Sequence, residues 1–126
     1  MQTLYPCLRY KDADAAIDFL VSAFGFEVAE AHRDDAGVLV HAELSYGPSR
    51  IMLGQDRGDA DPVHAGHLGR GWTYVAVKDA DAHHAQALAA GAEITTGLTD
   101  QDYGSRDYAA KDPEGNQWNF GTYRPA

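Results

Sequence analysis

This chain of 126 residues has one cysteine, no long apolar run and few basic side chains, and each shortage narrows its function. The single cysteine, Cys7, excludes an internal disulfide. No apolar run is long enough for a signal peptide or a membrane span, so we expect a soluble protein of the reducing cytoplasm. Ten Lys and Arg against 19 Asp and Glu give a formal net charge of −9, which disfavours nucleic acid and anionic membranes and favours cationic or neutral partners.

The pentapeptide KDADA occurs twice, from Lys11 to Ala15 and from Lys78 to Ala82. At nearly the same distance after each copy comes a glycine, and two residues later a glutamate. Such a match in so short a chain indicates a duplicated unit of about half the chain. We therefore divide the single domain into module 1 (1–54), a connecting loop (55–70) and module 2 (71–126).

Each copy of the motif sits between a predicted strand and a predicted helix. Aromatic and β-branched residues favour strands at 4–10 and 72–77. Asp12 and Asp79 stand at N-cap positions, and Gly25 and Gly91 end the two helices. Apolar residues recur at helical spacing clearly in the first helix and more weakly in the second, where they are Ala82, Ala85, Leu88 and Ala89. This spacing predicts that His83 and His84 face solvent. The period then changes from 3.6 to 2, predicting strands at 27–33, 38–46, 50–54, 93–99, 106–111 and 117–123. The fold class is α+β, two βαβββ modules in tandem.

The two ends of the chain carry a family resemblance. The segment YPCLRYKDADAAIDFLVSAFGFE resembles the opening strand and helix of the vicinal oxygen chelate superfamily, which includes glyoxalase I, bleomycin-resistance proteins and extradiol dioxygenases. The segment KDPEGNQWNFGTY is similar to its closing hairpin and last strand. The resemblance implies that each module curls into a half-barrel, that two half-barrels from one chain or from two enclose a cavity, and that the protein is a homodimer.

The resemblance also implies where a metal would bind. The four positions that carry metal ligands in this superfamily correspond to Tyr5, Met52, Trp72 and Asn119. This set does not chelate a divalent ion, because indole offers no lone pair and thioether is a weak donor. We therefore expect no cofactor at these positions and leave open a divalent metal at a displaced site.

Strand alternation predicts the lining of the cavity. Val38, Val40, Ala42 and Leu44 form the apolar side of their strand and should pack on the helix, which points His41 and Glu43 inward. Arg106 and Tyr108 follow a turn, and which side of their strand lines the cavity is open. The candidate ligand-binding residues are Tyr5, Cys7, Arg9, His41, Glu43, Met52, Trp72, Tyr74, Tyr103, Arg106, Tyr108 and Asn119.

Several of these residues have a structural interpretation as well. Trp72 and Tyr74 could fill the core, Cys7 could be a small buried hydrophobe, and His41 with Glu43 could be a hydrogen-bonded structural pair. His64 and His67 in the loop have a spacing compatible with a metal, but are also typical surface residues.

Two function classes follow. The first is a metal-free protein that binds a small aromatic or cationic organic molecule, as in antibiotic sequestration. The second is a lyase, isomerase or dioxygenase that uses a displaced metal around His41 and Glu43, or uses these two residues as acid and base.

Overall fold

A computed structural model describes residues 2–58 and 66–125 of the chain, and it confirms the two predicted βαβββ modules. The strands of module 1 form one sheet in the order β1-β4-β3-β2, and those of module 2 form a second sheet in the order β5-β8-β7-β6. In each sheet the first and last strands of the module pair in parallel, and the remaining pairs are antiparallel. The elements of module 1 are β1 (Cys7–Tyr10), α1 (Ala13–Phe24), β2 (Glu27–Arg33), β3 (Leu39–Tyr46) and β4 (Ser49–Gln55). Those of module 2 are β5 (Trp72–Ala76), α2 (Ala80–Ala89), β6 (Glu93–Asp100), β7 (Arg106–Lys111) and β8 (Gln117–Gly121).

The KDADA motif starts both helices as predicted. The carboxylate of Asp12 accepts from the amide of Ala15, and that of Asp79 accepts from the amide of Ala82. Each bond satisfies an amide that the first helical turn leaves without a partner. At the other end of α1, Gly25 adopts φ 82°, a left-handed conformation that glycine takes without steric cost.

The predicted buried face of α2 was wrong. Its buried residues are Ala80, His83 and Ala87, whereas Leu88 is exposed. The helix is rich in alanine, so its apolar pattern is weak, and the predicted buried face was set mainly by the position of Leu88. The structure instead buries His83, because both ring nitrogens find partners there.

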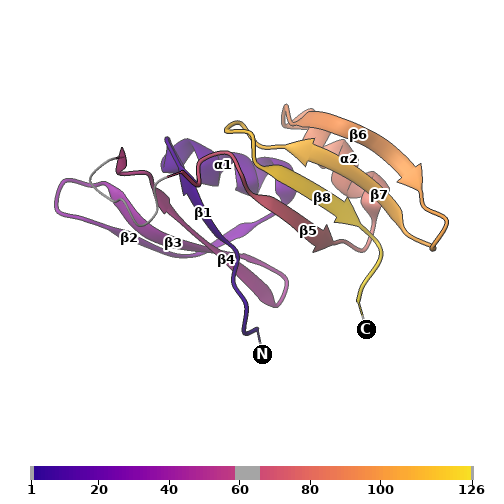
Figure 1. Cartoon of the computed structure of the whole chain (residues 1–126), viewed down its shortest axis with the longest axis horizontal. Coiled ribbons are helices and arrows are strands. Elements are labelled where there is room, and N and C mark those ends of the chain that lie inside the picture. The colour runs from indigo at the N-terminus through magenta and orange to yellow at the C-terminus, as the bar shows by residue number, and fades with distance from the viewer. Residues whose placement is uncertain (1, 59–65, 126) are drawn as a thin grey trace.

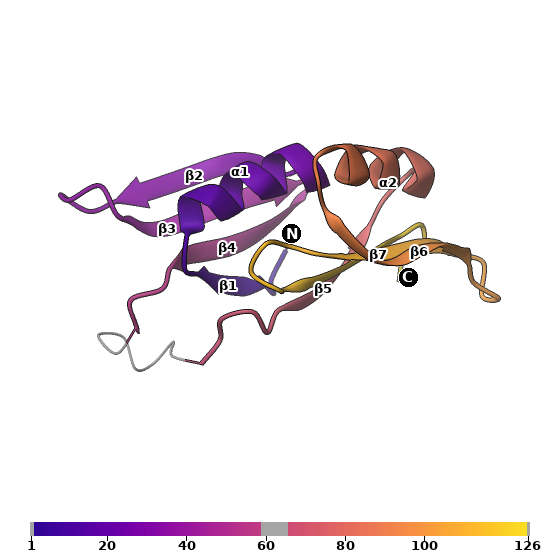
Figure 2. The ribbon, with the colours of Figure 1, turned by 90° about the horizontal axis from the view of Figure 1, so that it is seen from above.

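Both helices lie on the same side of the two sheets, and the modules share one core (Figures 1 and 2). Phe24 of α1 lies 5.8 Å from Trp118 and 4.8 Å from Phe120 of β8, measured between ring centroids. Burial of these rings stabilises the contact between the modules. The sheets do not close into a barrel within the chain. We call the side of each sheet that faces away from the helices its open face.

Strand β3 differs from its prediction at one end. Leu39 is buried, whereas Val38 is exposed and Val40 is half-buried. The pairing of β2 with β3 shifts register between His32 and Arg33, and this irregularity changes which side chain faces the core. In the described part of the chain, no helix has the length and apolar character needed to cross a bilayer.

Candidate functional site

The open face of module 1 carries the polar residues that alternation predicted. Cys7 of β1 is in register with Met52 of β4, and Met52 with Glu43 of β3, so the three form one row across the sheet. Arg9 is in register with Gly54, whose missing side chain leaves room for the guanidinium. A smaller hollow of about 220 Å³ lies along this face. Cys7 is exposed, which corrects its interpretation as a buried hydrophobe.

Glu43 is the centre of a charged network on this face. One of its oxygens lies 3.0 Å from Nε2 of His41, and the other accepts from Nη1 of Arg50 at 2.8 Å. These bonds, that of His41 first, lower the pKa of the Glu43 carboxyl. A carboxylate held in this way is a weaker base than a free one. His41 and Glu43 therefore form a hydrogen-bonded pair, which is one of the two interpretations that the sequence left open.

The open face of module 2 is aromatic. The side chain of Trp72 is 76% exposed, and its indole N–H donates to Oδ1 of Asn119 at 2.8 Å. Tyr74 is also exposed, and its hydroxyl donates to the carbonyl of Tyr123 at 2.7 Å. Neither ring fills the core, which corrects that alternative. Both rings are uncovered, and both are held by a hydrogen bond.

Asp107 of β7 is a residue of this face that the sequence analysis missed. Its carboxylate accepts from the hydroxyls of Ser105 and Tyr103, the latter at 3.0 Å. It also lies over Gly121, where a side chain on the neighbouring strand would collide with it. An anionic group beside Tyr74 and Tyr103 is suited to a cation. The sequence carries a signal for it, because Asp107 lies between the candidate residues Arg106 and Tyr108.

Arg106 and Tyr108, the neighbours of Asp107 in the sequence, lie on the other side of β7. Tyr108 is buried in the core, where its hydroxyl is 2.5 Å from Nδ1 of His83. Arg106 binds the carboxylates of Asp81 in α2 and Asp100 in β6. Neither side chain reaches the open face, so both are removed from the ligand-binding set. The prediction failed because the turn before β7 left the side of its residues undetermined.

The four histidines of the connecting loop and of α2 lie in different surroundings. His64 lies outside the described residues, and His67 is exposed beside the hollow of module 1. His84 is half-buried and packs edge-on against Tyr108 at 5.0 Å. His83 is buried, which corrects its predicted exposure. Its Nε2 must donate to the carbonyl of Phe24, so Nδ1 accepts from Tyr108, and burial lowers the pKa of this neutral imidazole.

The residues at the family's metal positions do not fit a metal ion. The Oδ1 atom of Asn119 already accepts from Trp72 and from Gln117, and Met52 faces a thiol and a carboxylate that belongs to an ion pair. Tyr5 precedes β1, and its hydroxyl donates to the carbonyl of Gln2. Within residues 2–58 and 66–125, no three His, Cys, Asp or Glu side chains converge on a common point suited to a metal. We derive no chemistry through a metal at these positions.

Comparison with known proteins supports the fold and the family. An uncharacterised protein of Mycobacterium bovis is 36% identical over 124 residues, covering 94% of this chain and 81% of the mycobacterial protein. The crystal structure of TioX from Micromonospora sp. ML1 has a TM-score of 0.84 and 31% identity, covering 98% of this chain and all of TioX. Lactoylglutathione lyase from Agrobacterium tumefaciens has a TM-score of 0.70 at 23% identity, covering 95% of this chain and 92% of that enzyme, which shows a common fold. Residues 3–120 match the model of the Glyoxalase/Bleomycin resistance protein/Dioxygenase superfamily, and the chain belongs to that superfamily.

Proposed function

We propose that this protein binds a small aromatic or cationic organic molecule on its open faces, without a metal. One observation carries the proposal: the rings of Trp72 and Tyr74 on β5 and of Tyr103 in the turn before β7 are exposed, and a hydrogen bond orients each of them. Exposed aromatic groups that are held in place are typical of binding sites. A flat ligand would stack on these rings.

Charge supports the cationic part of the proposal. Asp107 lies among the aromatic rings of module 2, and Glu43 lies on the corresponding face of module 1. The chain as a whole carries a net charge of −9, which attracts cations over a longer range. Sequestration of a basic antibiotic would use both features, and the free thiol of Cys7 is compatible with the reducing cytoplasm that we propose as its location.

The second candidate is an enzyme that uses His41 and Glu43 as acid and base. The 3.0 Å contact between them supports it. The lowered pKa of Glu43 and its second bond to Arg50 weaken it, because a general base works best with a pKa near the operating pH.

Two substitutions separate these functions. Titration of bleomycin, and of the planar cation acriflavine, into the wild type by calorimetry should give saturable binding. Trp72→Ala should weaken binding at least about tenfold because it removes a stacking surface, whereas Glu43→Gln should change it less than about threefold. Binding that survives Trp72→Ala, combined with turnover of a substrate that Glu43→Gln stops, would favour the enzyme.

We further propose that the protein is a homodimer in which the open faces of two chains enclose the ligand. The edge strands β1 and β5 each pair with one strand only, so backbone groups remain for a partner to cover. The exposed aromatic side chains of module 2 would also lose water on association. Light scattering should give about twice the chain mass of 13.6 kDa, and a single species of 13.6 kDa at micromolar concentration would contradict the dimer.

A further inference from the structure

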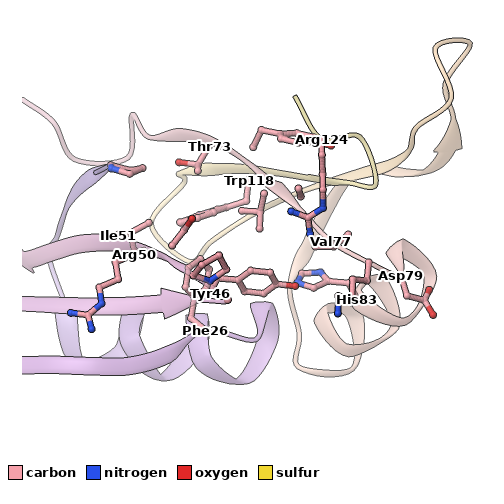
Figure 3. A pocket seen from close by; sticks show the side chains of 18 of the residues that line it. Phe26, Tyr46, Arg50, Ile51, Thr73, Val77, Asp79, His83, Trp118 and Arg124 are labelled. Carbon is pink, nitrogen blue, oxygen red and sulfur yellow. The ribbon is translucent and has the colours of Figure 1, made fainter. Parts of the chain in front are cut away.

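A second cavity, of about 720 Å³, lies between the two modules beside α2, and we call it the joint cavity (Figure 3). Most of its lining lies outside the open faces that carry the proposed function, and it shares Arg50 and Tyr74 with them. Its accessible apolar wall includes Pro48, Val75 and Ala76, the buried residues Phe26, Ile51 and Trp118 also line it, and a polar part is formed by Tyr46, Lys78 and Arg124. A volume of this size is in the range of pockets that hold small organic ligands.

The internal repeat explains why this cavity exists. In the corresponding place beside α1, the turn between β7 and β8 fills the space. There the Glu114 carboxylate accepts from the backbone amides of Lys11 at 2.6 Å and Asp12 at 2.9 Å. These are the first two residues of the KDADA motif, so in module 1 this motif binds a carboxylate supplied by module 2. The helix dipole adds to the attraction.

Among the residues that the structure describes, no such carboxylate binds the second KDADA motif. The facing turn, between β3 and β4, contains Gly47 and Pro48, and both line the joint cavity. The amides of Lys78 and Asp79 form no hydrogen bond with any residue that the structure describes. The two motifs are identical in sequence, and within residues 2–58 and 66–125 only the first has an anionic partner.

The side chains around the joint cavity also favour an anion. Arg124 and Lys78 form no ion pair with other described residues, and the hydroxyl of Tyr46 has no hydrogen-bond partner among them. In Figure 3 the guanidinium of Arg124 reaches toward Tyr46 and His83. Among the described lining residues the Asp79 carboxylate is the one acid, and it caps α2 by accepting from the amide of Ala82. The cavity is thus locally basic in a protein whose net charge is −9.

We propose that the joint cavity binds an amphipathic carboxylic acid. Its apolar body packs on Pro48, Val75 and Ala76, which line the cavity and are at least partly accessible, and its carboxylate binds Arg124 and the Tyr46 hydroxyl near the start of α2. The carboxylate of the ligand would thus lie beside the second KDADA motif, as the Glu114 carboxylate lies beside the first. A carboxylate with a guanidinium partner forms a charge-assisted bond that a neutral analogue lacks.

The test is calorimetric titration with 2-naphthylacetate and with its neutral amide as the matched probe. We expect saturable binding of the acid at millimolar concentration or below, and at least about tenfold weaker binding of the amide. Arg124→Gln should weaken binding of the acid about tenfold and Tyr46→Phe about threefold. Arg33→Gln removes a cation on β2 that does not line the cavity. This variant should keep the affinity for the acid within about twofold of the wild type.

Three results would overturn the proposal: no saturation by the acid, equal affinity for acid and amide, or full affinity in both Arg124→Gln and Tyr46→Phe. A larger loss in Trp72→Ala than in Arg124→Gln would place the acid on the open face and would also overturn it. The cationic ligands of the proposed function do not need Arg124. The two proposals can therefore fail independently, and each is tested by its own titration. Circular dichroism of each variant excludes unfolding as the cause of a loss.

Discussion

The two modules share one topology, yet they differ at the turn that each presents to the other. In module 2 the turn from Asp112 to Asn116 packs against module 1 through Tyr10 and the start of α1. In module 1 the turn at Gly47 and Pro48 is short and leaves the joint cavity beside α2. The open faces differ as well, because that of module 1 holds a charged network and that of module 2 holds aromatic rings. Both copies keep the same scaffold, and the differences between them lie at the sites that we propose for ligands.

Asp112→Ala should disrupt the turn from Asp112 to Asn116 and have the largest effect on stability. Its buried carboxylate accepts from the hydroxyl of Tyr10 at 2.6 Å, the indole of Trp118 at 3.2 Å and the amide group of Asn116 at 3.1 Å. Loss of this network should lower the free energy of unfolding by about 3 kcal/mol. Urea denaturation measures it.

Ser49→Ala, at the start of β4 directly after the opposite turn, is the matched control. It should change the free energy of unfolding by less than about 0.5 kcal/mol, because Ser49 is exposed. Equal losses in Asp112→Ala and Ser49→Ala would mean that the two turns do not differ as we describe.

His83 makes the stability of the protein depend on pH. It occupies the α2 position that Ala16 occupies in α1, and burial lowers its pKa. The unfolded chain therefore binds the proton more readily than the folded one. The contribution of this site should be complete above about pH 6.5 and should be lost as the pH falls from there through the lowered pKa.

Urea denaturation of the wild type and of His83→Gln between pH 7.5 and pH 5 tests this. The wild type should lose more stability over the interval than the variant does, because glutamine does not titrate. Parallel losses in both proteins would show that other groups cause the pH dependence.

Pro48→Glu should make the two turns more alike. It places a carboxylate on the turn that faces the second KDADA motif, as Glu114 does at the first. The new side chain should compete with 2-naphthylacetate and weaken its binding about tenfold, whereas Pro48→Gln should weaken it less. If the two variants bind the acid equally well, charge at this turn is irrelevant to the cavity.

Glu43→Gln should have the smallest effect on stability, although it removes the centre of the network of module 1. Its partners His41 and Arg50 are solvent-accessible, and ion pairs of this kind contribute little. The midpoint of thermal unfolding should stay within about 2 °C of the wild type. A much larger drop would mean that this network, and not the shared core, holds the first sheet together.

Sequence patterns predicted most of the fold, because the repeat, the capping aspartates and the strand alternation are all local signals. Alternation placed Cys7, Glu43, Trp72 and Asn119 on the correct faces. It failed at α2, where hydrogen bonds from distant residues decide the burial of His83, and at β7, where Asp107 faces outward in place of its neighbours. The joint cavity could not be predicted, since it depends on how one module packs against the other.

Tryptophan fluorescence tests the central claim most directly, because the chain has one exposed and one buried tryptophan. The protein is first dialysed against EDTA and then titrated with acriflavine or bleomycin. We predict saturable quenching that comes from Trp72, is absent in Trp72→Phe, and has the same midpoint before and after dialysis. Quenching that persists in Trp72→Phe, or that appears only after a divalent metal is added back, would contradict metal-free binding on the open face of module 2.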